Sequence, residues 1–208
     1  MSEQYVHLKS TQKLIEEALL RAIKYDEYRK MVSQMAQDGR STGPKQTEAL
    51  ANYTILNDRR MKRFDKTFKI KPEYAEKIKG HKRKVIWLVL TESWCGDAAP
   101  SLPVMNKMAE LNPNIDFKVA LRDENIELMD RFRYNETLSI PKLIMTDKTT
   151  GEILGDWGPR PSTATKMAEK NKKEHGKLTA EFKEGLQVWY NKDKGQNILD
   201  DLIGLLLK

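Results

Sequence analysis

Cys95 is the residue in this sequence with the clearest potential for chemistry, because it is the only cysteine in the chain. It lies in the run Trp94-Cys95-Gly96-Asp97-Ala98. Residues 85–90 before it are continuously apolar and β-prone, which predicts a buried strand, and helical spacing of apolar side chains after it predicts a helix. A cysteine at the start of a helix is close to backbone N–H groups and the helix dipole, which favour the thiolate. The pattern predicts an accessible, nucleophilic sulfur between a strand and a helix.

Two further features occur at fixed places after this motif: Pro103 inside the predicted helix, and Ile140-Pro141 just before a predicted strand. With them, residues 84–162 resemble the thioredoxin superfamily. The resemblance implies a thioredoxin fold in which a cis peptide bond before the second proline lies against the reactive cysteine. It also implies that Cys95 is the catalytic residue and that a substrate platform surrounds it, formed by Trp94, Gly96, Asp97, Ile140 and Pro141.

The chain departs from the dithiol members of that family at three positions. Ala98 replaces the second, resolving cysteine, Asp97 replaces the usual proline, and Val89 stands where the family has a buried aspartate. A single cysteine can form a mixed disulfide, but no second thiol in the chain can release it. The partner is therefore expected to be a protein or a low-molecular-weight thiol or disulfide.

Two functions from different classes fit these residues. The first is a monothiol thiol–disulfide oxidoreductase that uses Cys95 without an internal resolving cysteine. The second is a redox-inactive thioredoxin-fold interaction module, in which Cys95 only packs and the helical parts outside residues 84–162 form the working surface. A third reading is a thiol sensor whose oxidation changes assembly.

Three charged residues near the motif have competing interpretations. Asp97 either complements the helix dipole or, if it is close to the sulfur, raises the pKa of the thiol. Glu92 is expected to be a surface residue at a strand end, with a general acid or base as the alternative. Arg160 is expected to be an exposed linker residue, and the alternative places it near the sulfur, where it would stabilise a thiolate or grip a carboxylate.

The composition limits the other possible functions. The net charge is +7, and residues 57–84 hold twelve Lys and Arg against four Asp and Glu. This basic segment is interpreted as a solvated face, with an anionic partner as the alternative; nucleic acid is not expected, because no known nucleic-acid module is present. Three scattered histidines give no metal-ligand spacing, and no cofactor is expected. We find no signal peptide and no membrane-spanning run, so a cytoplasmic location is expected, and the oligomeric state stays open.

The expected fold class is α/β: a three-layer thioredoxin-like fold with about four strands, at 85–91, 115–121, 142–147 and 152–157. Helices are expected at 11–37, 46–68, 72–80, 98–111, 124–134, 162–190 and 198–206, with Gly176 or Gly185 as breaks in the long one. The first two should form a hairpin docked on the sheet. The domain prediction is a helical extension at 1–80 packed on the core, a thioredoxin-like core at 84–162 and C-terminal helices at 163–208.

Overall fold

The centre of the molecule is a four-stranded sheet with the order β2-β1-β3-β4. The structure is a computed structural model, and it describes residues 9–208. β1 is parallel to β2 and antiparallel to β3, and β3 is antiparallel to β4. The strands are β1 (Val85–Thr91), β2 (Ile115–Leu121), β3 (Lys142–Asp147) and β4 (Ile153–Trp157). All four predicted strands are present. The apolar run that predicted β1 is almost entirely buried, as expected for a central strand with helices on both faces of the sheet.

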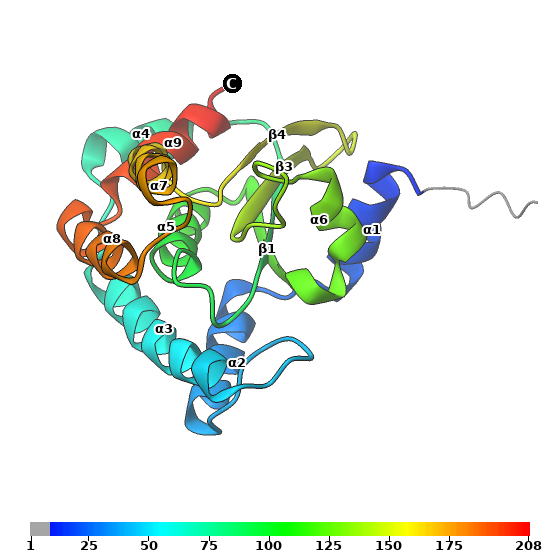
Figure 1. Cartoon of the computed structure of the whole chain (residues 1–208). Helices are drawn as coiled ribbons and strands as arrows, with labels where there is room; N and C mark the ends of the chain where they lie inside the picture. Colours follow the sequence, from blue (N-terminus) through cyan, green and yellow to red (C-terminus); the bar gives the residue numbers. More distant parts are fainter. Residues whose placement is uncertain (1–8) are drawn as a thin grey trace, which may run out of the picture.

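Nine α-helices within residues 9–208 surround this sheet. In Figure 1, α1 and α6 lie together on one side of the sheet, whereas α5, α7, α8 and α9 lie on the other. α3 and α4 pack outside α5, and α9 packs against β4. This arrangement is the predicted three-layer α/β fold. The helices are α1 (Thr11–Arg21), α2 (Tyr25–Gln37), α3 (Glu48–Thr67), α4 (Pro72–Gly80), α5 (Ala98–Leu111), α6 (Ile126–Arg131), α7 (Ser162–His175), α8 (Ala180–Asp193) and α9 (Gln196–Leu206).

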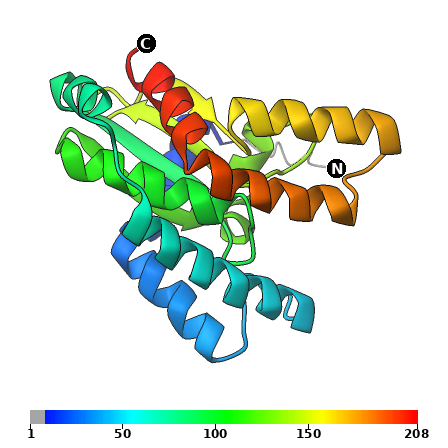
Figure 2. The same cartoon turned by 90° about the vertical axis from the view of Figure 1, so that its left-hand side faces the viewer.

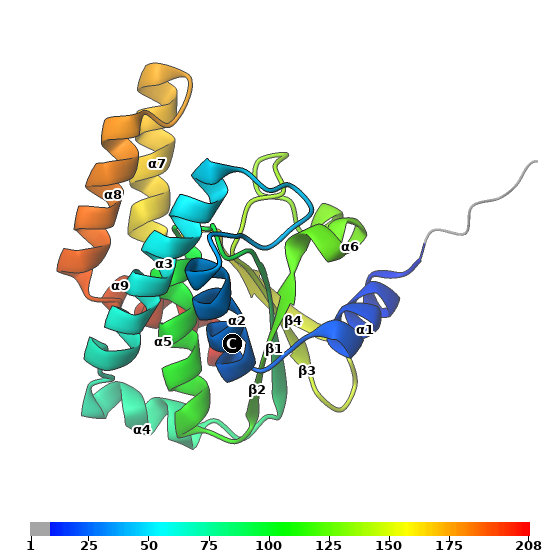
Figure 3. The same cartoon turned by 90° about the horizontal axis from the view of Figure 1, so that it is seen from below.

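The predicted single helix at 11–37 was wrong, because the chain is extended between α1 and α2. Ile23 forms an antiparallel bridge with Val119 of β2, and each residue donates its N–H to the other's carbonyl at 2.9 Å. A new helix then starts, with the Lys24 N–H bound to the Glu27 carboxylate at 2.8 Å. The predicted hairpin is therefore formed by α2 and α3, while α1 packs separately against α6 (Figure 3). Pairing with the sheet overrides local helix propensity at these residues.

Helical spacing of apolar residues predicts a buried seam on α3, and its second half is buried as expected. The predicted residues are Leu50, Tyr53, Ile55 or Leu56, Met61, Phe64 and Phe68, of which Met61, Phe64 and Phe68 are buried. Tyr53 was expected to be buried, yet it is 47% exposed, and of the two alternatives Ile55 and Leu56, Ile55 is half-buried and Leu56 is 43% exposed. Thr54 and Asn57 are buried instead, because they bind Ser93 in the β1–α5 loop. The Thr54 and Ser93 hydroxyls are 2.8 Å apart, and the Asn57 amide donates to the Ser93 carbonyl at 2.9 Å. Polar groups of this loop therefore determine which face of α3 turns inward.

The C-terminal helices form an antiparallel pair, α7 and α8, that projects from the body of the molecule (Figure 2). The long helix predicted at 162–190 ends at Gly176, which has φ +73° and caps α7 in the left-handed conformation. Gly185, the other predicted break, lies inside α8, which continues to Asp193. The helix predicted at 124–134 is shorter and spans only Ile126–Arg131 after a 3₁₀ turn.

Candidate functional site

Cys95 lies in the loop that joins β1 to α5, two residues before the helix cap at Asp97. Its own N–H donates to the Glu92 carbonyl at 3.1 Å, which tightens the turn. The backbone N–H groups of Asp97 and Ala98 face the sulfur and favour its thiolate form. The loop therefore places the sulfur at the N-terminus of α5, as the sequence pattern predicts.

The thiol itself is closed off in this structure. Cys95 is only 7% exposed, and its S–H donates to the Ile140 carbonyl at 3.2 Å. Burial, and then the nearby Asp97 carboxylate, raise the pKa of Cys95 to about 12, while the backbone N–H groups and Arg160 act in the opposite direction. The expectation of an accessible thiol was wrong for this conformation, because desolvation outweighs the helix terminus.

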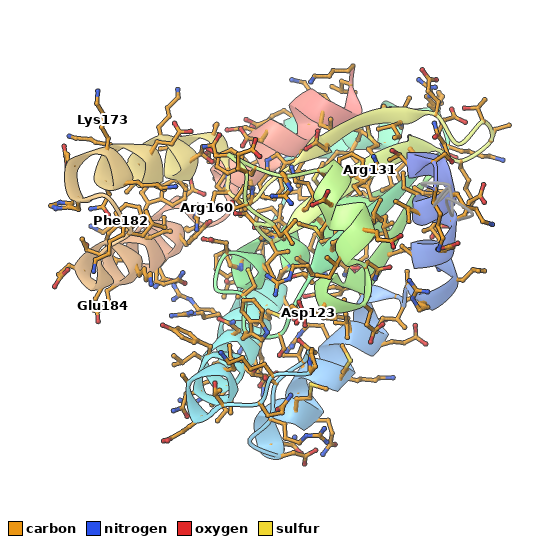
Figure 4. The ribbon with its side chains drawn as sticks, turned by 45° about the vertical axis from the view of Figure 1, so that its right-hand side comes forward. Asp123, Arg131, Arg160, Lys173, Phe182 and Glu184 are labelled. Carbon is orange, nitrogen blue, oxygen red and sulfur yellow. The ribbon has the colours of Figure 1, made fainter. Side chains whose placement is uncertain are left out.

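Asp97 joins the loop to the C-terminal part of the chain. Its carboxylate accepts from Arg160 at 2.7 Å and from the Tyr190 hydroxyl of α8 at 3.1 Å. Burial raises the pKa of the Asp97 carboxyl, and these two donors oppose that increase. The interpretation of Arg160 as an exposed linker residue was wrong: its side chain is 20% exposed, at the base of the α7–α8 pair (Figure 4). The alternative, that it grips a carboxylate, is confirmed.

α8 and α3 approach the same turn at Gly96. A Cβ built on Gly96 would lie 3.4 Å from the Gln187 amide nitrogen of α8 and 3.7 Å from an Arg60 guanidinium nitrogen of α3. A side chain at this position would therefore contact both helices. These are ordinary van der Waals distances, and they show that both helices reach the residue next to the sulfur.

The predicted platform residues surround Cys95. The Ile140–Pro141 bond is cis, and Ile140 is buried with its carbonyl on the thiol. Trp94 is half-buried, and the Arg122 guanidinium lies 4.9 Å from the centre of its ring. Gly158, at the end of β4, packs so closely that a Cβ built on it would be 2.1 Å from the Pro141 carbonyl oxygen. Only a glycine fits at this contact, which fixes the loop before Arg160.

Glu92 is not the surface residue that was expected. It is fully buried, and one carboxylate oxygen accepts from the Asp123 N–H at 2.9 Å. The other oxygen has no partner within the described residues. Burial raises the pKa of the Glu92 carboxyl. The loop that contains Thr42 and Gly43 covers it, and Asp123, which marks this region in Figure 4, contacts the same loop.

Several residues around the site had no local signal in the sequence. Tyr190 and Gln187 come from α8, and Arg60 comes from the middle of α3, so each is far from Cys95 in the chain. Arg60 was noted only as part of the basic segment. Leu186 and Tyr190 are four residues apart, so they lie on the same face of α8, and this spacing indicates that the helix packs through that face. The spacing does not indicate which part of the molecule the face contacts.

Neither a metal centre nor a membrane span is found in the part of the chain that the structure describes. Within residues 9–208, no three side chains of the types His, Cys, Asp and Glu are grouped to hold a metal ion. No helix in the same range is long and apolar enough to cross a bilayer.

Comparison with known proteins gives a family match and two structural neighbours. A family model described as thioredoxin matches residues 43–174. A crystal structure of a protein of unknown function from Pseudomonas aeruginosa is 17% identical with a TM-score of 0.58, covering 73% of this chain and 84% of its own. An HIV epitope-scaffold is 16% identical with a TM-score of 0.56, covering 84% of this chain and 96% of its own. These two neighbours share the fold. No curated protein matches the chain significantly.

Proposed function

Because this chain belongs to the thioredoxin family, we propose that Cys95 is the nucleophile of a single-cysteine thiol–disulfide exchange protein. The observation that carries the proposal is the position of the sulfur, at the N-terminus of α5 and 3.2 Å from the Ile140 carbonyl. Trp94, Gly96, Asp97, Ile140 and Pro141 form the substrate platform around it. In this proposal residues 84–162 carry the chemistry, and the helical segments 9–80 and 163–208 control access to it; the first eight residues of the predicted extension lie outside the described part of the chain.

The proposed reaction begins when the Cys95 thiol loses its proton to water and its thiolate attacks one sulfur of an external disulfide. The electron pair of the thiolate forms the new S–S bond, and the pair of the broken bond leaves with the second sulfur as a thiolate, which takes up a proton. An external thiol then attacks the mixed disulfide and returns Cys95 to the thiol. Each step exchanges one S–S bond for another.

The closed conformation requires one further event before this reaction. α8 has to withdraw from the loop, because Cys95 is 7% exposed and has a pKa of about 12 in the closed state. The bond from Tyr190 to Asp97 is the hydrogen bond that joins α8 directly to the residue at the start of α5, and a second bond, from Arg63 of α3 to Asn191, also holds α8. Withdrawal admits water, which lowers the desolvation penalty on the thiolate.

The alternative is a redox-inactive thioredoxin-fold interaction module. The same burial and the same raised pKa favour it, since they describe a cysteine that is protonated and packed in its resting state. In this case Cys95 is a small core residue, and the function belongs to the outer faces of the helices.

The reaction of the native chain with 4,4′-dithiodipyridine, an uncharged disulfide that releases a coloured thiol, separates the two functions. The thiol-exchange proposal expects one equivalent of product from the folded chain, none from Cys95→Ser, and a faster reaction with Tyr190→Phe. Tyr25→Phe is the matched control, since it removes a 2.6 Å hydroxyl–carboxylate bond to Asp65 on a different helix pair. If both the native chain and Tyr190→Phe react only after denaturation, the interaction module is the correct function.

A further inference from the structure

The outward face of α3 carries apolar and cationic side chains that are not used by the core. Tyr53, Leu56, Arg60 and Arg63 follow one another at intervals of three, four and three residues, so they line one stripe of the helix. We call these four residues the α3 stripe. It is roughly 15 Å long at the rise of an α-helix. Tyr53 and Leu56 are 47% and 43% exposed, so together they present apolar area to solvent at one end of the stripe.

The exposure of the two apolar residues is fixed by the packing of the opposite face. Thr54 and Asn57 are held inward by their bonds to Ser93, at 2.8 and 2.9 Å. Because α3 cannot rotate without losing these bonds, Tyr53 and Leu56 stay in solvent. The apolar end of the stripe is therefore a fixed part of the surface.

The charge on the same face is entirely positive beyond the first turn. Asp58 and Asp65, the two acids in the middle of α3, are both bound by Arg29 of α2, at 3.2 and 3.0 Å. Among residues 9–208, no carboxylate lies within 4.0 Å of the five cations of this helix, which are Arg59, Arg60, Lys62, Arg63 and Lys66. Arg29 thus removes the negative charges that would otherwise balance them.

The α3 stripe leads directly to the candidate site. Arg60 is half-buried beside Gly96, and its guanidinium donates to the Asn57 side-chain oxygen at 3.0 Å. Burial lowers the pKa of Arg60, and the Asp97 carboxylate, which is not in direct contact with it, acts in the opposite direction. Arg63 then lines a pocket of about 270 Å³ between α3 and the end of α8, together with the Phe64 and Phe68 side chains. Figure 3 shows α3 and α8 converging at this end.

From this surface we propose that the α3 stripe binds an acidic segment of a partner protein that also carries an apolar side chain. Carboxylates of the segment pair with Arg60 and Arg63, and the apolar side chain packs on Tyr53 and Leu56. A protein fits this surface better than a nucleic acid does, because half of the stripe offers apolar area and Leu56 has no flat face for a base. The binding does not require Cys95 to react, so this inference goes beyond the proposed chemistry and holds for either function.

The test is the binding of a fluorescein-labelled peptide of about twelve residues, composed of Glu, Asp and two Leu, to the Cys95→Ser chain. We expect fluorescence anisotropy to detect binding that weakens as salt increases, because the charges are exposed. Arg60→Glu with Arg63→Glu should weaken it at least about tenfold, and Leu56→Ser about threefold. Circular dichroism checks that each variant is folded.

Lys166→Glu with Lys173→Glu is the matched control, because it makes the same change in net charge on exposed positions of α7. Lys173 projects from the outer side of that helix in Figure 4. Unchanged affinity in this control supports the α3 stripe. An equal loss in both double variants, no binding of the peptide, or tighter binding of single-stranded RNA that depends on Arg60 and Arg63 would overturn the proposal.

Discussion

Replacing Asp97 with asparagine tests the electrostatic account of the thiol. The Asp97 carboxylate is the second cause, after burial, of the pKa of about 12 at Cys95. Asp97→Asn removes its negative charge and leaves the Arg160 cation in place, and both effects favour the thiolate. We therefore expect the pKa of Cys95 to fall by about 1–3, the range that one charged neighbour produces.

The size of the effect on reactivity follows from the thiolate fraction. At pH 8 a thiol with a pKa of about 12 is about one part in ten thousand thiolate, roughly 2,000-fold less than a free thiol of pKa about 8.5. A fall of 1–3 in the pKa raises that fraction about 10- to 1,000-fold. Because intrinsic nucleophilicity falls with the pKa, with a Brønsted coefficient of about 0.4–0.5, the rate should rise only about 3- to 60-fold.

The assay is the rate of reaction with 4,4′-dithiodipyridine between pH 6 and about 10.5. The reagent is uncharged, so the variant does not change its attraction to the site. Asp116→Asn is the control, since it removes a carboxylate bound to Lys148 at 2.7 Å on a different part of the sheet. A variant that reacts faster but keeps the pH dependence of the native chain would refute the electrostatic reasoning and indicate that only access had changed. A native pKa below that of a free thiol would refute it as well.

Three further predictions concern stability. Gly158→Ala should destabilise the fold by at least about 2 kcal/mol in urea unfolding, because its φ is +115° and the new Cβ would be 2.1 Å from a backbone oxygen. Gly185→Ala is the control inside α8, where a new Cβ would have no atom within 4 Å, and it should stabilise the fold by about 0.5–1 kcal/mol. Equal effects of the two variants would contradict the close packing of Gly158 on Pro141. Arg160→Ala should cost about 3 kcal/mol in the same assay, since it leaves a buried carboxylate without its cation, and a neutral result would show that the pair is dispensable. Arg83 lowers the pKa of the Asp147 carboxyl, so the ionised carboxylate stabilises the fold above the unfolded pKa of about 3.9, and this contribution is lost as the pH falls through the folded pKa. The urea midpoint of unfolding should therefore change less steeply from pH 7 to 2 in Asp147→Asn than in the native chain. Identical slopes in the two proteins would exclude this contribution.

The central part of the fold could be predicted from the sequence because its signals are local. The apolar run of β1, the turn before β4 and the proline at the start of α4 each determine an element without help from distant residues. The break between α1 and α2 has no such signal, since Ile23 is neither a glycine nor a proline. Its conformation depends on Val119, almost one hundred residues away.

In the candidate site, too, the features with a local sequence signal could be predicted, and those that depend on distant residues could not. Cys95, Ile140 and Pro141 could be identified from the sequence as residues that the structure brings together. The burial of the thiol could not be predicted from the sequence, because it depends on contacts between distant parts of the chain. Tyr190 of α8, for example, binds Asp97 from 93 residues further along the chain. The burial of Glu92 could not be predicted either, because the loop around Gly43 covers it. The sequence of that loop predicts a turn but not where the turn packs.

The bridge between Ile23 and Val119 has a consequence for solubility. β2 is an edge strand of the sheet, and an uncovered edge strand can pair with another chain and start aggregation. Both hydrogen bonds that Val119 would offer outward are taken by Ile23. At the opposite edge, the pairing of β3 with β4 is irregular between Met145 and Thr146 of β3, and α9 packs on β4. The short extended segment before α2 thus protects the sheet against intermolecular strand pairing.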